Sequence, residues 1–204
     1  MSFVCILDYG SGNVRSVANL FSLVADSVEI SNAESAIRRA THVVLPGVGA
    51  FGAAMRKILE RIPVEALHKA VIDDGKPFLG ICVGMQVLAE EGEEFGIHRG
   101  LGWIQGRVTR LDAGELPLPH VGWNDVAAAR ASPLLAGLGS EADFYFVHSF
   151  AFRPGDERDV VAVSSYGEKF CSVLARGNVF GVQFHPEKSQ RAGIRMAKNF
   201  LALR

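Results

Sequence analysis

The sequence has 204 residues, 49% of them hydrophobic and 21% charged, and its 21 Lys and Arg nearly balance its 22 Asp and Glu. This length can bury one substantial core without disulfides or a metal, so we expect a single domain over residues 1–204. The balanced charge excludes the clustered cations typical of proteins that bind nucleic acid or anionic membranes, and we expect neither partner.

The longest uncharged stretches, 43–55 and 77–89, contain glycines and are shorter than the roughly 20 residues of a membrane span. The N-terminal segment lacks a basic region and soon reaches Asp8, unlike a secretory signal. The three cysteines form neither a pair nor a metal-binding spacing, which fits a reducing compartment. We therefore expect a cytoplasmic protein with no metal or other cofactor.

The first half alternates continuous apolar runs with segments of helical periodicity. Parallel strands that are covered on both faces have this pattern, because each crossover passes over the sheet. The sequence therefore predicts an α/β fold with a doubly wound, mostly parallel sheet flanked by helices. Strands are expected at 3–7, 28–30, 42–45 and 77–81, and helices from Val14 to Phe21, from a Ser31/Glu34 capping box to Arg39, from Ala50 to Ile62, and from Pro63 to a stop at Gly75.

The second half has strand patterns with few helices between them. Residues 176–178 (Arg-Gly-Asn) form a hairpin signal, and a helix is expected from about Gln190 to Leu203. We expect these strands to extend the same sheet in antiparallel fashion. They are predicted at 103–111, 143–147, 160–165, 170–175 and 179–184.

Cys82 is the candidate nucleophile. It lies in a Gly-x-Cys-x-Gly motif at a strand-to-helix junction, where small flanking residues permit a sharp turn that exposes the side chain. The N-terminus of the following helix favours a thiolate there. Cys5 and Cys171 lie inside apolar strands, and we expect both to be buried structural residues.

A thiol nucleophile needs a base, and the base needs a group that orients it. The apolar run 179–184 ends at His185, and Pro186 stops the strand so that Glu187 can turn back and accept a hydrogen bond from the imidazole. Taken alone, the same residues also fit a strand-end histidine beside a solvated glutamate.

The Pro-Gly-Val-Gly segment at 46–49 follows a strand and can present backbone N–H groups to an oxyanion. An ordinary Gly-rich turn has the same composition. Gly10-Ser11-Gly12 is not a dinucleotide fingerprint, because Arg15 occupies the place of its third glycine.

Two longer motifs contain these residues: Gly-Ile-Cys-Val-Gly-Met-Gln at 80–86 and Val-Gln-Phe-His-Pro-Glu at 182–187. Five further segments accompany them. These are Tyr-Gly-Ser-Gly-Asn at 9–13, Pro-Gly-Val-Gly-Ala-Phe-Gly at 46–52, His-Val-Gly-Trp-Asn at 120–124, Tyr-Phe-Val-His-Ser at 145–149, and Lys188-Ser189.

With these motifs the sequence resembles, over nearly its whole length, the class I glutamine amidotransferases, and among them the glutaminase subunits of imidazole glycerol phosphate synthase. The resemblance implies that Cys82 attacks the carboxamide of glutamine, that His185 transfers the protons and that Glu187 orients His185. It also implies an oxyanion hole formed by backbone amides after a peptide flip. The residues assigned to that hole are Gly47, Val48, Gly49 and Val83.

The resemblance further implies a heterodimer with a (β/α)8-barrel cyclase, which uses the ammonia to make imidazole glycerol phosphate and an aminoimidazole carboxamide ribotide in histidine biosynthesis. The implied glutamine pocket is Gln86, Glu94, His148 and Ser149, although Glu94 could also be one more exposed acid. The implied interface is Asn13, Trp123, Tyr145 and Lys188. In the same order, these four could also be a helix cap, a core indole, a core phenol and a solvated lysine.

Three other functions fit part of the pattern. A glutaminase subunit of a different synthase, such as one that makes anthranilate or GMP, would lack the Gly-Trp-Asn and Phe-Val-His-Ser segments. A Cys-dependent α/β hydrolase would place its acid between nucleophile and histidine in the chain, whereas Glu187 follows His185. A catalytically silent regulator of the cyclase would not need the complete triad.

Overall fold

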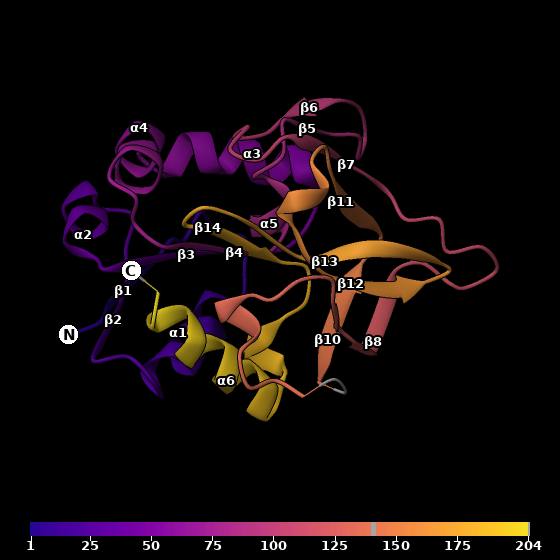
Figure 1. Ribbon diagram of the computed structural model, residues 1–204. Coiled ribbons are helices and arrows are strands. Elements are labelled where there is room, and N and C mark those ends of the chain that lie inside the picture. The colour runs from indigo at the N-terminus through magenta and orange to yellow at the C-terminus, as the bar shows by residue number, and fades with distance from the viewer. Residues whose placement is uncertain (140–141, 204) are drawn as a thin grey trace.

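A sheet of eight strands runs through the molecule, with helices on both faces (Figure 1). The computed structural model describes residues 1–139 and 142–203. Neighbouring strands are parallel from β2 to β14 and antiparallel from β14 to β9, which confirms the predicted fold class. In spatial order the strands are β2 (Ser27–Ile30), β1 (Phe3–Ile6), β3 (His42–Gly47), β4 (Phe78–Cys82), β14 (Val179–Val182), β13 (Glu168–Arg176), β12 (Val160–Tyr166) and β9 (Ala127–Ala128).

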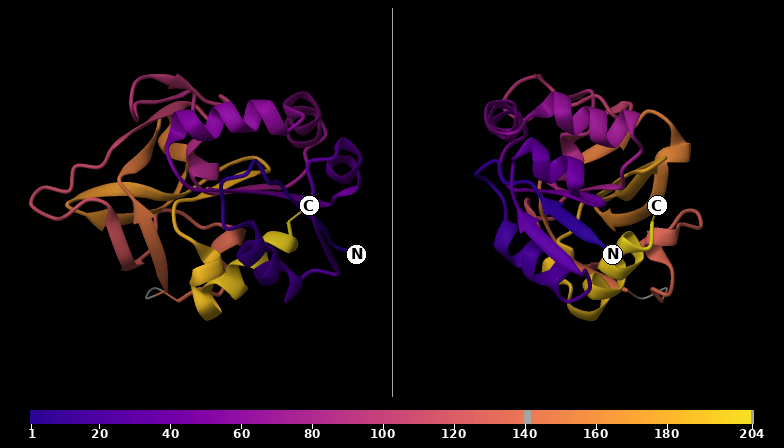
Figure 2. Two further views of the ribbon diagram at one scale, coloured as in Figure 1. Left: turned by 180° about the vertical axis from the view of Figure 1, so that it is seen from behind. Right: turned by 90° about the vertical axis from the view of Figure 1, so that its left-hand side faces the viewer.

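Helices α1 and α6 cover one face of this sheet, and α3 and α4 cover the other (Figures 1 and 2). Their apolar residues recur at helical spacing, so each helix buries one stripe against the sheet. The rings of Phe21 on α1 and Phe200 on α6 meet edge to face at 6.0 Å. The α-helices are α1 (Val14–Ser22), α2 (Glu34–Arg39), α3 (Phe51–Arg61), α4 (Val64–His68), α5 (Val83–Gln86) and α6 (Gln190–Leu201).

Two predicted strands do not extend the main sheet, and this part of the prediction is wrong. Residues 143–147 lie in a two-stranded sheet, and residues 106–110 of the expected strand 103–111 lie in a four-stranded one. In β8 and β10 exposed and buried residues alternate, as in a small antiparallel sheet with one face toward solvent. The small sheets comprise β8 (His120–Asp125) with β10 (Asp143–His148), and β11 (Phe150–Pro154), β7 (Gly106–Arg110), β5 (Glu91–Gly92) and β6 (His98–Arg99).

Two predicted helices also differ in detail. The helix expected from Pro63 to Gly75 is α4 followed by a π-helical turn, Lys69–Asp73, although Gly75 does have the left-handed φ of a helix stop, +72°. The Ser31/Glu34 capping box is absent, because α2 begins only at Glu34 and Ser31 Oγ accepts from Ala33 N, 3.2 Å away. Short 3-10 helices occur at Pro133–Leu135, Glu157–Asp159 and Pro186–Lys188.

The strand-to-helix turn at Cys82 is a strained backbone feature. Cys82 has φ of +55° and ψ of −112°, a region that residues with a Cβ rarely adopt. A Cβ on Gly84 would lie 1.8 Å from the carbonyl oxygen of Leu45. The turn therefore requires glycine at 84, as the Gly-x-Cys-x-Gly motif predicts.

Within the two described ranges, no helix is long and apolar enough to cross a membrane.

We predict that Gly84→Ala destabilises the protein by roughly 1–3 kcal/mol or more, because the new methyl group overlaps backbone that cannot move aside. Gly139→Ala is the matched control: no atom of the described residues lies within 4 Å of its added Cβ, so its effect stays within about 0.5 kcal/mol. Urea unfolding of both variants checks this. Equal stability of the two variants would contradict the packing argument.

Candidate active site

Three parallel strands deliver the predicted catalytic segments to one edge of the sheet. Gly47 at the end of β3 pairs with Cys82 at the end of β4, and Val182 at the end of β14 pairs with Ile81. His185 lies just beyond the end of β14. Because the carboxyl ends of parallel strands meet at the same edge, segments far apart in sequence come together there.

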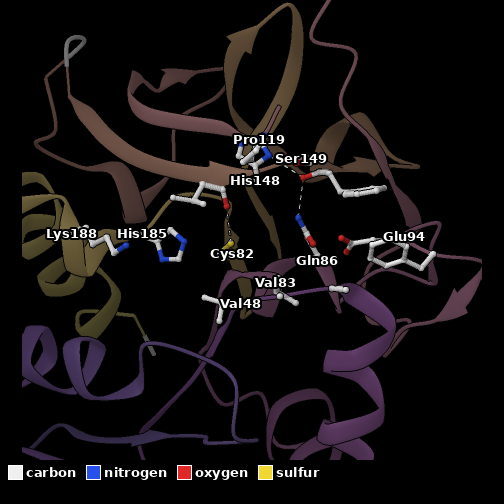
Figure 3. Close-up of a pocket in the computed structure, with 15 residues that line it drawn as sticks. Val48, Cys82, Val83, Gln86, Glu94, Pro119, His148, Ser149, His185 and Lys188 are labelled. Atoms are coloured by element: carbon white, nitrogen blue, oxygen red, sulfur yellow. Dashed lines mark hydrogen bonds between the residues drawn. The ribbon is translucent and has the colours of Figure 1, made fainter. Parts of the chain in front are cut away.

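Cys82 lines a pocket but is only 3% exposed, so the predicted exposure of its side chain by the sharp turn is wrong (Figure 3). Its sulfur is 3.8 Å from the carbonyl oxygen of Val147 and 3.7 Å from Nε2 of Gln183. Cys5 and Cys171 are also buried, as predicted, and burial raises the pKa of each thiol well above its ordinary value of 9.0. They therefore remain protonated structural residues.

His185 and Glu187 form a buried pair. The imidazole Nδ1 donates to Glu187 Oε1 over 2.9 Å, and Asn13 Nδ2 donates to the same oxygen over 3.3 Å. The two side chains are 5% and 1% exposed, so Glu187 is not the solvated glutamate that the sequence left open. Since Glu187 occupies Nδ1, Nε2 is the ring nitrogen left for Cys82 (Figure 3).

The electrostatic surroundings of His185 favour its charged form. Burial acts against protonation, but the neighbouring Cys82 and Glu187 outweigh it and raise the pKa of His185 from 6.5 to about 10. The pair can therefore hold an imidazolium between sulfur and carboxylate at neutral pH.

All four residues predicted to bind glutamine line the same pocket, which has a volume of about 400 Å³. This volume is in the range of small-molecule sites. Glu94 is half-buried rather than an exposed acid, and its Oε2 accepts from the backbone N–H of Phe51 at the start of α3 over 2.9 Å. Gln86 is buried, and its amide donates to Phe150 O over 3.0 Å and to Gln183 Oε1 over 3.1 Å.

His148 is held as a neutral imidazole. Burial, the largest cause, lowers its pKa to about 3. Its Nδ1 bonds Phe150 O over 3.0 Å, so this nitrogen carries the proton, and Nε2 accepts from Nδ1 of His120 over 3.1 Å. Burial also lowers the pKa of His120, whose ring stacks on Phe146 and Tyr166. His120 begins the 120–124 motif, but its sequence setting indicated only a surface or packing residue.

Three of the predicted oxyanion residues, Val48, Gly49 and Val83, line this pocket, whereas Gly47 is not among its described lining residues. Gly49 has φ of +92°, and Val48, which is 41% exposed, lines the pocket together with Val83. Val83 is the first residue of α5, so its N–H has no acceptor within the helix.

Tyr9 lies beneath the 47–49 segment and is a residue whose role the sequence did not reveal. A Cβ on Gly47 would lie 2.4 Å from its hydroxyl oxygen, and this hydroxyl is buried without a hydrogen-bond partner among the described residues. Burial, and next the nearby Cys82, raise the pKa of Tyr9 well above its ordinary value of 10.0.

Three of the residues predicted for a partner interface, Trp123, Tyr145 and Lys188, form a row of contacts beside His185, and the fourth, Asn13, lies beside Glu187. The indole of Trp123 is 49% exposed, so it is not a core indole, and it meets the ring of Tyr145 edge to face at 6.0 Å. Lys188 Nζ lies 4.9 Å from the centre of the Tyr145 ring. The backbone of Tyr145 pairs with that of His185 in an isolated antiparallel β-bridge. Asn13 contacts Glu187 directly. These four residues connect the triad to the surface.

Comparison with known proteins agrees with this geometry. The family model described as glutamine amidotransferase class-I matches residues 5–203. The imidazole glycerol phosphate synthase subunits HisH of Zymomonas mobilis and Salinibacter ruber are 45% and 48% identical, over 98% and 97% of this chain and 95% and 93% of theirs. A solved glutamine amidotransferase, 19% identical, shares the fold with a TM-score of 0.74 over 98% of this chain and 99% of its own. The chain belongs to the class-I glutamine amidotransferases and, within them, to the family of HisH subunits of imidazole glycerol phosphate synthase.

Proposed function

We propose that the chain hydrolyses glutamine to glutamate and ammonia with Cys82 as nucleophile, His185 as proton carrier and Glu187 as the group that orients His185. The observation that carries this proposal is the meeting of the Cys82 sulfur, the buried His185–Glu187 pair and the 400 Å³ pocket at one sheet edge. The pocket is lined by the side chains that the substrate would contact.

The reaction begins with the Cys82 proton on His185. The thiolate attacks the carboxamide carbon, and the tetrahedral oxyanion is held by backbone N–H groups from the Val48–Gly49 segment and from Val83. His185 then protonates the departing nitrogen, so ammonia leaves and a γ-glutamyl thioester remains. Water, deprotonated by His185, hydrolyses the thioester and releases glutamate.

The pocket offers complementary groups for the rest of glutamine. The carboxylate of Glu94 attracts the α-ammonium group, and the backbone and hydroxyl of Ser149 provide hydrogen bonds near it. His148 stays neutral, so it adds no positive charge beside the His185 imidazolium. We assign Gln86, Glu94, His148 and Ser149 to glutamine binding on these grounds.

The ammonia acceptor is a second subunit. The relatives are named as subunits of a synthase, and the chain acts in a complex with a cyclase partner. We propose that this partner is a (β/α)8-barrel cyclase, that the surface of Asn13, Trp123, Tyr145 and Lys188 docks on it, and that the chain works as one domain in the cytoplasm. Free ammonia would be protonated and lost in water, so docking directs it to the cyclase.

We also propose that the oxyanion hole is completed in the complex. Val48 and Gly49 line the pocket beside Cys82, and the positive φ of Gly49 lets the peptide between them turn at little cost. Until this peptide presents its N–H to the oxyanion, the hole lacks one donor, so glutamine is not hydrolysed when no acceptor is docked.

Cys82→Ala is expected to abolish glutamine-dependent synthesis while the complex still uses added ammonium, because the thiol acts in only one half of the reaction. Steady-state assays with glutamine and with ammonium salts measure both activities. Substantial glutamate release by the purified alanine variant would refute Cys82 as the nucleophile.

His185 is expected to remain protonated from pH 6 to pH 8, since its pKa is raised to about 10. In Cys82→Ser the sulfur that helps to raise the pKa of His185 is lost, so the titration midpoint of His185 moves downward. Imidazole ¹⁵N chemical shifts give the charge state in both proteins. A neutral His185 throughout that range in the unsubstituted chain would contradict the ion-pair description.

Glutaminase turnover is expected to be low in the isolated chain and to rise by about 10²–10³ when the cyclase and its nucleotide ligand bind, the typical value of one oxyanion donor. Glutamate release is measured for the chain alone, the complex and the ligand-saturated complex. Equal turnover in all three would show that the oxyanion hole is always formed.

A further inference from the structure

Gln183 contacts the reacting sulfur and has no role in the mechanism above. Its Nε2 lies 3.7 Å from Cys82 Sγ, within hydrogen-bonding range for sulfur. We propose that Gln183 is a further catalytic residue, whose amide N–H donates to the sulfur and stabilises its anionic form. This inference rests on the proposed role of Cys82 as the nucleophile.

The orientation of the Gln183 amide follows from its neighbours. The carbonyl oxygen of Phe150 can only accept, so the atom of Gln86 that bonds it over 3.0 Å is the NH₂ group (Figure 3). The same NH₂ group meets Gln183 over 3.1 Å, and the facing atom must therefore be the oxygen of Gln183. This leaves the NH₂ group of Gln183 directed at the sulfur. A reversed amide would place an oxygen against a thiolate and two NH₂ groups against each other.

Burial holds this arrangement in place and shields it from bulk solvent. Gln183 is completely buried, and Gln86 is 3% exposed. The backbone N–H of Gln183 donates to Ser172 O over 2.9 Å, which continues the pairing of β14 with β13 and fixes the origin of the side chain. A hydrogen bond to a charged acceptor is strengthened where water is excluded.

The carbonyl oxygen of Val147, which also lies close to the sulfur, favours the thiol form instead of the thiolate. Val147 O, 3.8 Å away, can accept from a thiol S–H but repels a thiolate. When the proton moves to His185, the sulfur loses this partner, and the N–H of Gln183 then faces the new negative charge. Gln183 therefore favours the ionised sulfur and leaves the thiol form to Val147.

The anion occurs twice in the cycle. It is present before the S–C bond forms, and it returns when that bond breaks: water adds to the thioester carbon, its proton goes to His185, and the electron pair of the S–C bond goes back to sulfur. Gln183 stabilises the sulfur at both points, because its position does not depend on the substrate. Losing its N–H should lower the fraction of ionised sulfur available for attack and slow the breakdown of the thioester.

The test uses Gln183→Met, which keeps the length of the side chain but removes the donor, and Gln183→Asn, which withdraws the amide by one methylene. We expect kcat to fall about tenfold in each, the size of a hydrogen bond to a charged group, with KM for glutamine less affected. Alkylation of Cys82 by iodoacetamide should slow about tenfold near pH 6.5, and the difference should shrink as pH rises. A merely structural role would not produce this pH dependence.

Ser172→Ala is the matched control. Its side chain is equally buried on the neighbouring strand, and its hydroxyl has no hydrogen-bond partner among the described residues, so it should keep wild-type alkylation and turnover. Thermal unfolding identifies the variants that are folded. If the methionine variant does not fold, the results for Gln183→Asn are used instead. Wild-type alkylation and kcat in a folded Gln183 variant would overturn the inference while leaving Cys82 as nucleophile. Activity of Cys82→Ala would instead overturn the proposed function.

Discussion

The site depends on the parallel pairing of β14 with β4. These strands are about a hundred residues apart in the chain, yet Val182 lies opposite Ile81 and Gly181 opposite Gly80. A shift of this register by one residue would turn His185 away from Cys82, because side chains alternate between the faces of a strand. The antiparallel partner β13 holds β14 from its other side, so the strand that delivers the base is central in the sheet and not at an edge.

Near this strand pairing two buried histidines have different charge states: His185 is charged and His148 is neutral. His185 is held between the sulfur and Glu187, and both neighbours favour its positive form. His148, which lines the same pocket, is kept neutral by burial, which outweighs the opposite effect of its hydrogen bond to Phe150 O. The proposed chemistry needs both conditions, since a second positive charge beside His185 would disfavour the imidazolium that forms when His185 takes the proton of Cys82.

The sequence predicted the parts of the structure whose causes are local. A strand that ends in Gly-x-Cys-x-Gly predicts the turn at Cys82, and a strand that ends in His-Pro-Glu predicts the return of Glu187 to His185. Tyr9, His120 and Gln183 were not predicted to act at the site, because their importance comes from neighbours distant in the chain. In the sequence each looks like an ordinary strand or turn residue, and only the pairing of strands such as β8 with β10, or β14 with β4, brings these residues close to the site. The small sheets were missed for the same reason: strand periodicity reveals which face is buried but not which strand lies alongside.

In the proposed mechanism the Cys82 sulfur becomes covalently attached to the substrate. Acid quenching of the cyclase complex during turnover of ¹⁴C-labelled glutamine, followed by proteolysis and mass spectrometry, tests this directly. We expect a γ-glutamyl group on the peptide that contains Cys82, released by mild base as a thioester is. Turnover with no label on that peptide, or with label on another residue, would contradict it.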